Sequence, residues 1–207
     1  MAIIALDIET VPRAGIMDTW YPEWAAQKYP GKEGEDLEAM TALYPEFGQV
    51  CCISWTDAEV PGETIYHALA RTLVEEREML RQLGDTLESD AVLVGHNLKG
   101  FDIPFLAKRC MAHGLKVPAA LNQLGKKPWE VRHLDTMELM KFGSGNMSLR
   151  SACLMLGLDD PKQDACGAKV WDLFKAGRME SIGTYCSGDV RAVRDIFQAL
   201  RTATGAV

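Results

Sequence analysis

Two carboxylates one residue apart stand near the start of the chain, within the largely apolar residues 1–10. Asp7 and Glu9 are related as i and i+2, so a strand would place both side chains on one face. The apolar residues around them predict a buried strand, covered on both sides of the sheet. Two like charges buried together are costly, and a hard divalent metal ion would offset them. The pair alone is equally compatible with a strand that emerges into solvent at Asp7.

A third carboxylate follows a later apolar run. Residues 91–95 predict a buried strand, and the sequence Gly95-His-Asn-Leu-Lys-Gly-Phe-Asp102 leads from it into a predicted helix. In open α/β sheets, ligands collect at the carboxyl ends of strands, so Asp102 is expected near the first pair. Gly95 and Gly100 would let the backbone approach a ligand closely. The competing interpretation is that Asp102 caps the helix, a common use of aspartate.

The fourth carboxylate lies on the last predicted helix. Tyr185 and Asp189 are four residues apart, so they share a helix face one turn from each other. Because this face continues as an apolar stripe towards the sheet, Asp189 is expected to need a partner. A plain Tyr–Asp hydrogen bond at the helix edge is the alternative interpretation.

The remaining apolar patterns predict the elements that position these side chains. Their order predicts an α/β fold, a mixed sheet with helices on both faces, and the 207 residues suit a single domain. Gly157 is expected to end one helix. The predicted strands are 3–8, 50–55, 64–69, 91–95 and a short edge strand at 131–134; the predicted helices are 72–87, 102–113, 148–156 and 182–202.

Residues 13–47 do not fit this layered pattern. The segment is rich in Trp, Tyr, Pro and Gly, and we interpret it as a long irregular insertion, which is often functional. Its aromatic side chains could stack on nucleic-acid bases. We favour the interpretation that they anchor the insertion on the sheet, because aromatic residues supply large apolar burial.

Composition limits the class of protein. The net charge of −7 argues against a protein that coats nucleic acid nonspecifically, although residues 1–95 carry −12 and residues 96–207 carry +5. Apolar runs are too short to span a bilayer, and the first run lacks the basic flank of a signal peptide. The six cysteines show no zinc spacing and are expected to be buried thiols of a cytoplasmic protein.

The order D-x-E, F-D and Y-x-x-x-D resembles the DEDDy group of 3′–5′ exonucleases, DnaQ-like members of the ribonuclease H-like superfamily. The resemblance runs from Asp7 to Asp189, nearly the whole chain. Histidine-type relatives carry His at the position of Thr184, so the tyrosine type fits better. Residues 44–54, 170–178 and 185–190 look like the predicted exonucleases related to the proofreading domain of family-B DNA polymerases.

The resemblance implies a five-stranded ribonuclease H-like sheet and hydrolysis of single-stranded nucleic acid from a free 3′ end. Four carboxylates without a His or Cys ligand favour two Mg²⁺ or Mn²⁺ ions. By resemblance, Asp7 holds both ions, Glu9 and Asp189 hold the nucleophile-side ion, and Asp102 positions the other through water. Tyr185 would orient the attacking water.

Substrate contacts are predicted next to these ligands. The resemblance implies that backbone at Ile8–Thr10 fixes the 3′-hydroxyl, and that Asn97 and Phe101 contact sugar and base. Lys99 and Lys169 are weaker candidates for phosphate contact, and we favour a solvated surface position for either. Asp135 is expected to be a turn or capping residue.

Two other functions remain open from sequence. DNA is the favoured substrate, but an exoribonuclease on short RNA would use the same scissile phosphate. A catalytically silent nucleic-acid-binding module is the alternative from a different class, and the intact set of four carboxylates and Tyr185 argues against it. No oligomeric state is predicted.

Overall fold

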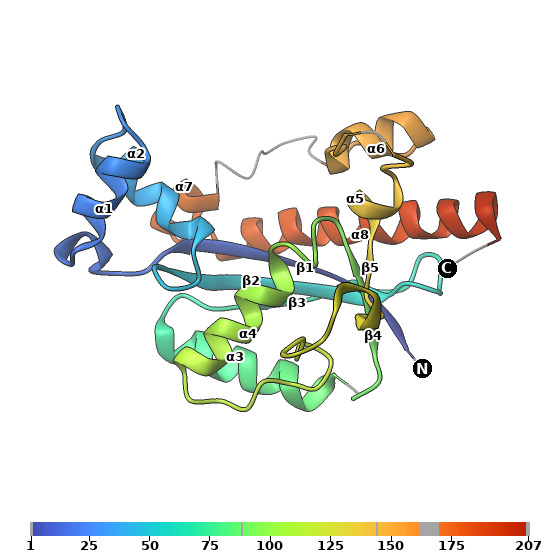
Figure 1. The fold of residues 1–207 in the computed structure, drawn as a ribbon, viewed down its shortest axis with the longest axis horizontal. Helices are drawn as coiled ribbons and strands as arrows, with labels where there is room; N and C mark the ends of the chain where they lie inside the picture. The colour runs from blue at the N-terminus through green and yellow to red at the C-terminus, as the bar shows by residue number, and fades with distance from the viewer. Residues whose placement is uncertain (1, 88, 144, 162–169, 206–207) are drawn as a thin grey trace.

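A mixed sheet forms the centre of the fold in a computed structural model that describes residues 2–87, 89–143, 145–161 and 170–205 (Figure 1). Its five strands are ordered β3-β2-β1-β4-β5. The pairs β1–β2 and β2–β3 are antiparallel, whereas β1–β4 and β4–β5 are parallel. This confirms the predicted α/β class and the five-stranded sheet. The strands are β1 Ile3–Pro12, β2 Gly48–Asp57, β3 Tyr66–Leu69, β4 Val92–Gly95 and β5 Leu134–Asp135.

Helices cover both faces of the sheet (Figure 1). The long helix α8, Met179–Thr204, crosses one face together with α5, Thr136–Leu139, and α6, Leu149–Leu156. Helices α3, Leu73–Thr86, and α4, Asp102–Ala112, pack on the other. None of the helices in the described ranges is long and apolar enough to cross a bilayer.

Local signals set several helix ends. Thr72 and Glu75 form a reciprocal capping box at the start of α3. Ser148 caps α6 by accepting a hydrogen bond from the backbone N–H of Ser151. Gly157 ends α6 with φ at 69°, a left-handed conformation that glycine adopts without a steric cost, as predicted.

Strand β1 alternates between the two cores. Ala5 packs in the cluster beneath α8, whereas Leu6 and Ile8 pack in the cluster beneath α3 and α4. The pairing with β2 shifts register between Glu9 and Thr10, so one extra residue of β2 lies opposite this point. Such bulges re-aim side chains and are common beside active sites.

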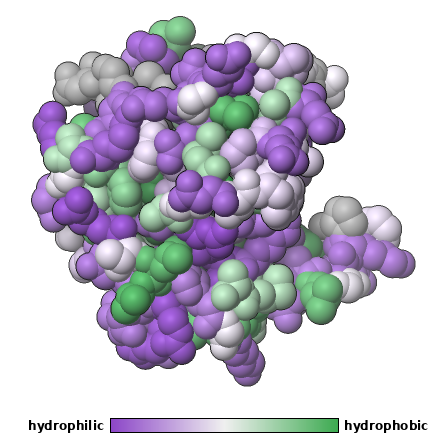
Figure 2. All heavy atoms as spheres, turned by 90° about the vertical axis from the view of Figure 1, so that its left-hand side faces the viewer, coloured by the Kyte–Doolittle hydropathy of each residue, from purple (hydrophilic) through white to green (hydrophobic). Residues whose placement is uncertain are grey.

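The 13–47 segment contains more regular structure than the sequence indicated. It forms η1 Ile16–Asp18, α1 Tyr21–Lys28, α2 Gly34–Ala39 and η2 Met40–Leu43. Its aromatic side chains pack mainly on one another around Phe47, which contacts Trp20, Tyr21, Trp24 and Tyr44. Figure 2 views the molecule from this end, where hydrophobic side chains form separate patches on a mostly hydrophilic surface. The aromatic side chains therefore supply apolar burial, but in a cluster of their own and not as anchors on the sheet.

The predicted edge strand at 131–134 was misplaced. Strand β5 begins only at Leu134, because the backbone N–H of Leu93 donates to the His133 ring at 3.0 Å instead of to a carbonyl of that strand. Helix α8 begins three residues earlier than the predicted start at 182. Helix α7, Val170–Lys175, was not predicted. The five cysteines within the described ranges are buried free thiols, and Cys166 lies outside those ranges.

Candidate active site

Asp7 and Glu9 lie side by side on the face of β1 that α8 covers. Both side chains are partly buried. One oxygen of each lies with the sulfur of Cys186 in a group whose members are all within 4.8 Å of one another. Because β1 stays paired in the sheet as far as Pro12, the strand does not emerge into solvent at Asp7.

Asp102 reaches the same strand from the start of α4. Its side chain is only 4% exposed, and it accepts a hydrogen bond from the backbone N–H of Ile8 at 3.1 Å. Burial raises the pKa of Asp102 well above its ordinary value, and the charge of Asp7 raises it further. The N-cap position belongs to Phe101, with no side-chain cap bond, so the helix-capping interpretation of Asp102 was wrong.

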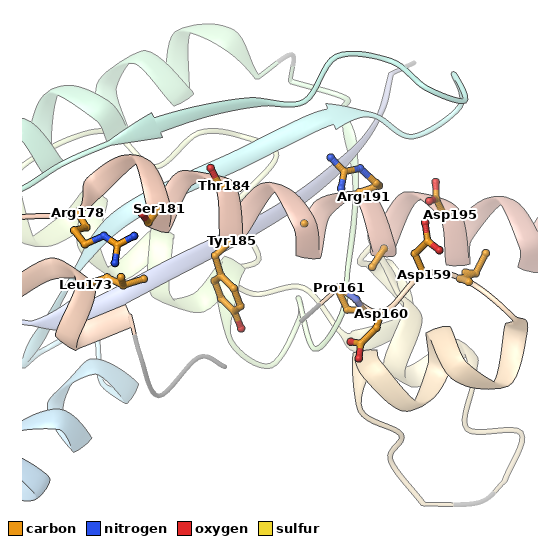
Figure 3. A pocket seen from close by; sticks show the side chains of 13 residues that line it. Asp159, Asp160, Pro161, Leu173, Arg178, Ser181, Thr184, Tyr185, Arg191 and Asp195 are labelled. Carbon is orange, nitrogen blue, oxygen red and sulfur yellow. The ribbon is translucent and has the colours of Figure 1, made fainter. Parts of the chain in front are cut away.

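Asp189 and Tyr185 approach from α8. They are 7% and 8% exposed and lie one turn apart on the helix. Asp189 and Asp7 line one cavity of about 400 Å³. Tyr185 lines a neighbouring cavity of about 690 Å³, and Figure 3 shows its ring projecting from α8 into this space. Acidic side chains from three elements, β1, α4 and α8, therefore lie around Asp7: its charge acts on Asp102 and Asp189 shares a cavity with it, although neither belongs to the 4.8 Å group of Asp7, Glu9 and Cys186.

His96 forms part of the wall of the Asp7–Asp189 cavity. One ring nitrogen, Nε2, donates to the carbonyl of Met147 at 2.8 Å, and the other, Nδ1, lies 2.9 Å from the hydroxyl of Thr136. The ring thus ties the end of β4 to α5 and to the loop before α6. Residues 146–148 of that loop and Leu149 at the start of α6 line the same cavity.

The loop between β4 and α4 is organised by Asp135. Its carboxylate accepts hydrogen bonds from the backbone N–H groups of Asn97 and Lys99 at 2.9 and 3.0 Å. It also caps α5 through the backbone N–H of Met137 at 3.0 Å. Asp135 is therefore the turn and capping residue that the sequence predicted.

The two glycines of this loop are needed by the protein itself. A Cβ at Gly95 would lie 2.8 Å from the Cβ of Leu98, and a Cβ at Gly100 would lie 2.5 Å from the side-chain oxygen of Asn97. Asn97 has φ at 64°. We expected these glycines to let a ligand approach the backbone closely. In the structure, the side chains of Leu98 and Asn97 occupy that space.

Several groups that the sequence predicted to contact substrate already bond to other groups of the protein. The amide of Ile8 donates to Asp102, and the hydroxyl of Thr10 donates to the carbonyl of Ala42 at 2.7 Å. The ammonium group of Lys99 pairs with Glu138 at 2.9 Å. Phe101 is partly buried and packs against Phe105 with 5.4 Å between ring centroids. Lys169 lies outside the described residues.

Sequence reasoning missed two residues beside the carboxylates. The Cys186 thiol lies 3.4 Å from Oδ2 of Asp7, and burial above all raises the pKa of Cys186, so it stays protonated and can donate. Its position directly after Tyr185 was the available signal. His96 was signalled only by its place at the end of a buried strand.

The fold and the acidic cluster define an α/β protein consistent with a ribonuclease H-like exonuclease domain. Residues 41–205 match the model of a family described as a predicted 3′–5′ exonuclease related to the exonuclease domain of PolB. The chain belongs to this family. It is also 25% identical over 246 residues to "Putative DNA polymerase 060R" of Frog virus 3 (isolate Goorha). That alignment covers 99% of this chain but only 22% of the viral protein.

Proposed function

We propose that this chain is a metal-dependent exonuclease that hydrolyses phosphodiester bonds from the 3′ end of single-stranded nucleic acid, with DNA favoured. The observation that carries the proposal is the convergence of Asp7, Glu9, Asp102 and Asp189 from three elements on one region. The preference for DNA is supported by the family's relation to PolB and by the name of the viral relative.

The donor set fits hard divalent cations. It offers carboxylate oxygens, which Mg²⁺ and Mn²⁺ prefer. The pKa of Asp102 is raised by burial and by the charge of Asp7, so these carboxylates are crowded enough to gain from a cation. We assign Asp7 to both ions, Glu9 and Asp189 to one of them, and Asp102 to the second through water. Two such ions, when bound, stabilise the attacking and leaving oxygens of an in-line displacement at phosphorus.

The chain's own residues would orient the reactants. Tyr185 is positioned one helical turn from Asp189, and its hydroxyl would hold the attacking water through a hydrogen bond. We assign Tyr185 an orienting role, because a phenol hydroxyl can both donate and accept a hydrogen bond. Cys186 donates to Asp7, which holds that carboxylate on the α8 side of β1.

The terminal nucleotide would lie between β1 and the loop before α4. Asn97 and Phe101 are our candidates for contact with sugar and base. Since the Ile8 amide and the Thr10 hydroxyl are engaged within the protein, contact with the 3′-hydroxyl from this stretch would use other backbone groups.

The proposal is tested by incubating 5′-labelled single-stranded DNA and RNA of one sequence with Mg²⁺, Mn²⁺ or EDTA. We expect a ladder shortened from the 3′ end with either metal, faster for DNA, and no shortening with EDTA. Asp189→Asn should abolish the ladder, whereas Asp85→Asn on the exposed side of α3 should not. Faster cleavage of RNA would assign an exoribonuclease, and binding without cleavage would assign a silent module; either result would contradict the proposal.

A further inference from the structure

The loop that leads from α4 to β5 exposes aromatic and basic side chains together. Trp129 is 78% exposed and Leu124 is 92% exposed. The ammonium nitrogen of Lys127 lies 5.2 Å from the centroid of the Trp129 ring. Lys126 and Arg132 are exposed on the same loop. We call Lys126, Lys127, Trp129 and Arg132 the loop surface.

The charge of this loop is opposite to that of the whole chain. Residues 113–133 contain four Lys or Arg and one Glu, in a chain of net charge −7. The one acid, Glu130, turns back to accept a hydrogen bond from the backbone N–H of Lys127 at 2.7 Å. The loop therefore carries a local positive charge that complements a polyanion, within a protein of negative net charge.

The loop enters the sheet at the amino end of β5, where His133 holds it to β4. The buried ring of His133 accepts from the backbone N–H of Leu93 at 3.0 Å and donates to the carbonyl of Ala120 at 2.6 Å. Burial lowers the pKa of His133, and the nearby charges of Lys126 and Lys99 lower it further. His133 lies two residues before Asp135, whose carboxylate accepts hydrogen bonds from the backbone N–H groups of Asn97 and Lys99 in the loop that leads to Asp102. Figure 1 shows the segment running beside β4 and β5.

We propose that the loop surface binds the nucleic-acid strand upstream of the scissile bond, with Trp129 stacked on a base and Lys126 and Lys127 on flanking phosphates. This inference rests on the proposed function, since it supplies a second contact for the same substrate. Stacking on an exposed aromatic ring tolerates any base, and flanking cations follow the backbone, which suits an enzyme that shortens strands of varied sequence. The contact between Lys127 and Trp129 places both recognition groups within one nucleotide repeat.

The first test is equilibrium binding in EDTA, where no cleavage is expected. Oligothymidylates of about 4 and about 20 nucleotides, labelled at the 5′ end, are titrated with the full chain and followed by fluorescence anisotropy. We expect Trp129→Ala to weaken binding of the long strand about tenfold, within the range known for base–aromatic stacking, and to leave the short strand unchanged. Equal affinity of wild type and variant for the long strand would overturn the proposal.

The second test is the salt dependence of the same binding. Each phosphate contact contributes about −0.7 to the slope of log K against log salt for single strands, so Lys126→Ala with Lys127→Ala should reduce the slope by about 1.4. The matched control is Lys32→Ala with Lys108→Ala, which removes two exposed lysines elsewhere. An unchanged slope in the loop variant, or an equal loss of affinity in the control, would overturn the assignment.

Hydrolysis separates the two proposals. Trp129→Ala should hydrolyse the short strand at the wild-type rate. Wild type should hydrolyse the long strand faster than the short one, and the variant should lose this difference in rate. Suppose that wild type cleaves neither strand while the loop variants still bind the long strand more weakly than wild type. That result would contradict the exonuclease proposal and support the binding role of the loop surface. If wild type cleaved both strands at the same rate, only the binding role of the loop surface would be contradicted.

Discussion

Buried acids in two regions of the molecule are compensated in different ways. On the α3 and α4 face, Glu76 is fully buried and accepts hydrogen bonds from Val50, Arg109 and His113. Its two bonds from Arg109 measure 2.9 and 2.6 Å. The protein's own cations therefore match this carboxylate, as a buried charge requires.

Asp102 presents the opposite case. It is almost as deeply buried, and it accepts a backbone hydrogen bond from Ile8, but the charges that act on it are those of Asp7 and Asp135, which are also acidic. A carboxylate matched by Arg serves to join elements of the fold. Carboxylates crowded with one another gain from a cation supplied by the solvent, which is why we assign the first site to stability and the second to catalysis.

The largest expected effect is the loss of catalysis when one acid is neutralised. Asp7→Asn keeps the volume of the side chain and removes its charge. Release of 3′ nucleotides in Mn²⁺ should fall by about a thousandfold or more, the scale seen when transition-state charge stabilisation is lost. Circular dichroism should show an unchanged fold. Activity within tenfold of wild type would contradict the assignment of the acidic site to catalysis.

At the pair of Glu76 and Arg109, the expected effect is on stability. Arg109→Met leaves the Glu76 charge buried without its main partner, so the free energy of unfolding in urea should fall by about 3–5 kcal/mol. The exonuclease rate at a temperature where the variant is folded should stay near that of wild type. Adding Glu76→Gln should recover part of the loss. A change below about 1 kcal/mol would show that the pair does not hold the helices.

A smaller effect is expected at Tyr185. Tyr185→Phe removes one hydrogen bond to the attacking water and leaves every carboxylate in place. We expect kcat to fall about tenfold, near the value of one lost hydrogen bond, with unchanged affinity for Mn²⁺. A loss as large as that of Asp7→Asn would indicate a more direct chemical role.

The smallest effect is the pH dependence of stability without metal. The pKa of Asp102 is raised above its ordinary 3.8, so the folded chain keeps this proton where the unfolded chain has released it. The free energy of unfolding should therefore fall as the pH rises from about 4 towards the raised pKa.

Asp102→Asn cannot ionise, and its carbonyl can still accept from Ile8. In EDTA this variant should lose less stability over the same pH range, measured by urea unfolding. Added Mn²⁺ should stabilise wild type more than the variant. Superimposable pH profiles would show that Asp102 carries no unfavourable charge.

The acidic site was more predictable from sequence than the Glu76 network. Asp7 and Glu9 are adjacent in a strand pattern, and Asp102 and Asp189 follow from strand ends and helix spacing. Glu76, however, looked like one of several charges on the helix at 72–87, because periodicity cannot tell which polar residue of an amphipathic helix faces a buried arginine. Only the tertiary packing of α3 on α4 brings Arg109 and His113 to it.

Other features depended on side chains that replace regular pairing. The His133 ring takes the place of a strand partner for Leu93, which shortens β5. The aromatic cluster around Phe47 lets the 13–47 segment fold on its own residues instead of on the sheet. The sequence shows the residue types in both places, but it does not show which contacts these residues form.

The most direct test of the central claim is a calorimetric titration of the chain with Mn²⁺ in the absence of nucleic acid. We predict saturable binding to wild type and to Asp85→Asn, and its loss in both Asp7→Asn and Asp189→Asn, which act from different elements on one site. Undiminished Mn²⁺ binding in those two variants would contradict the account.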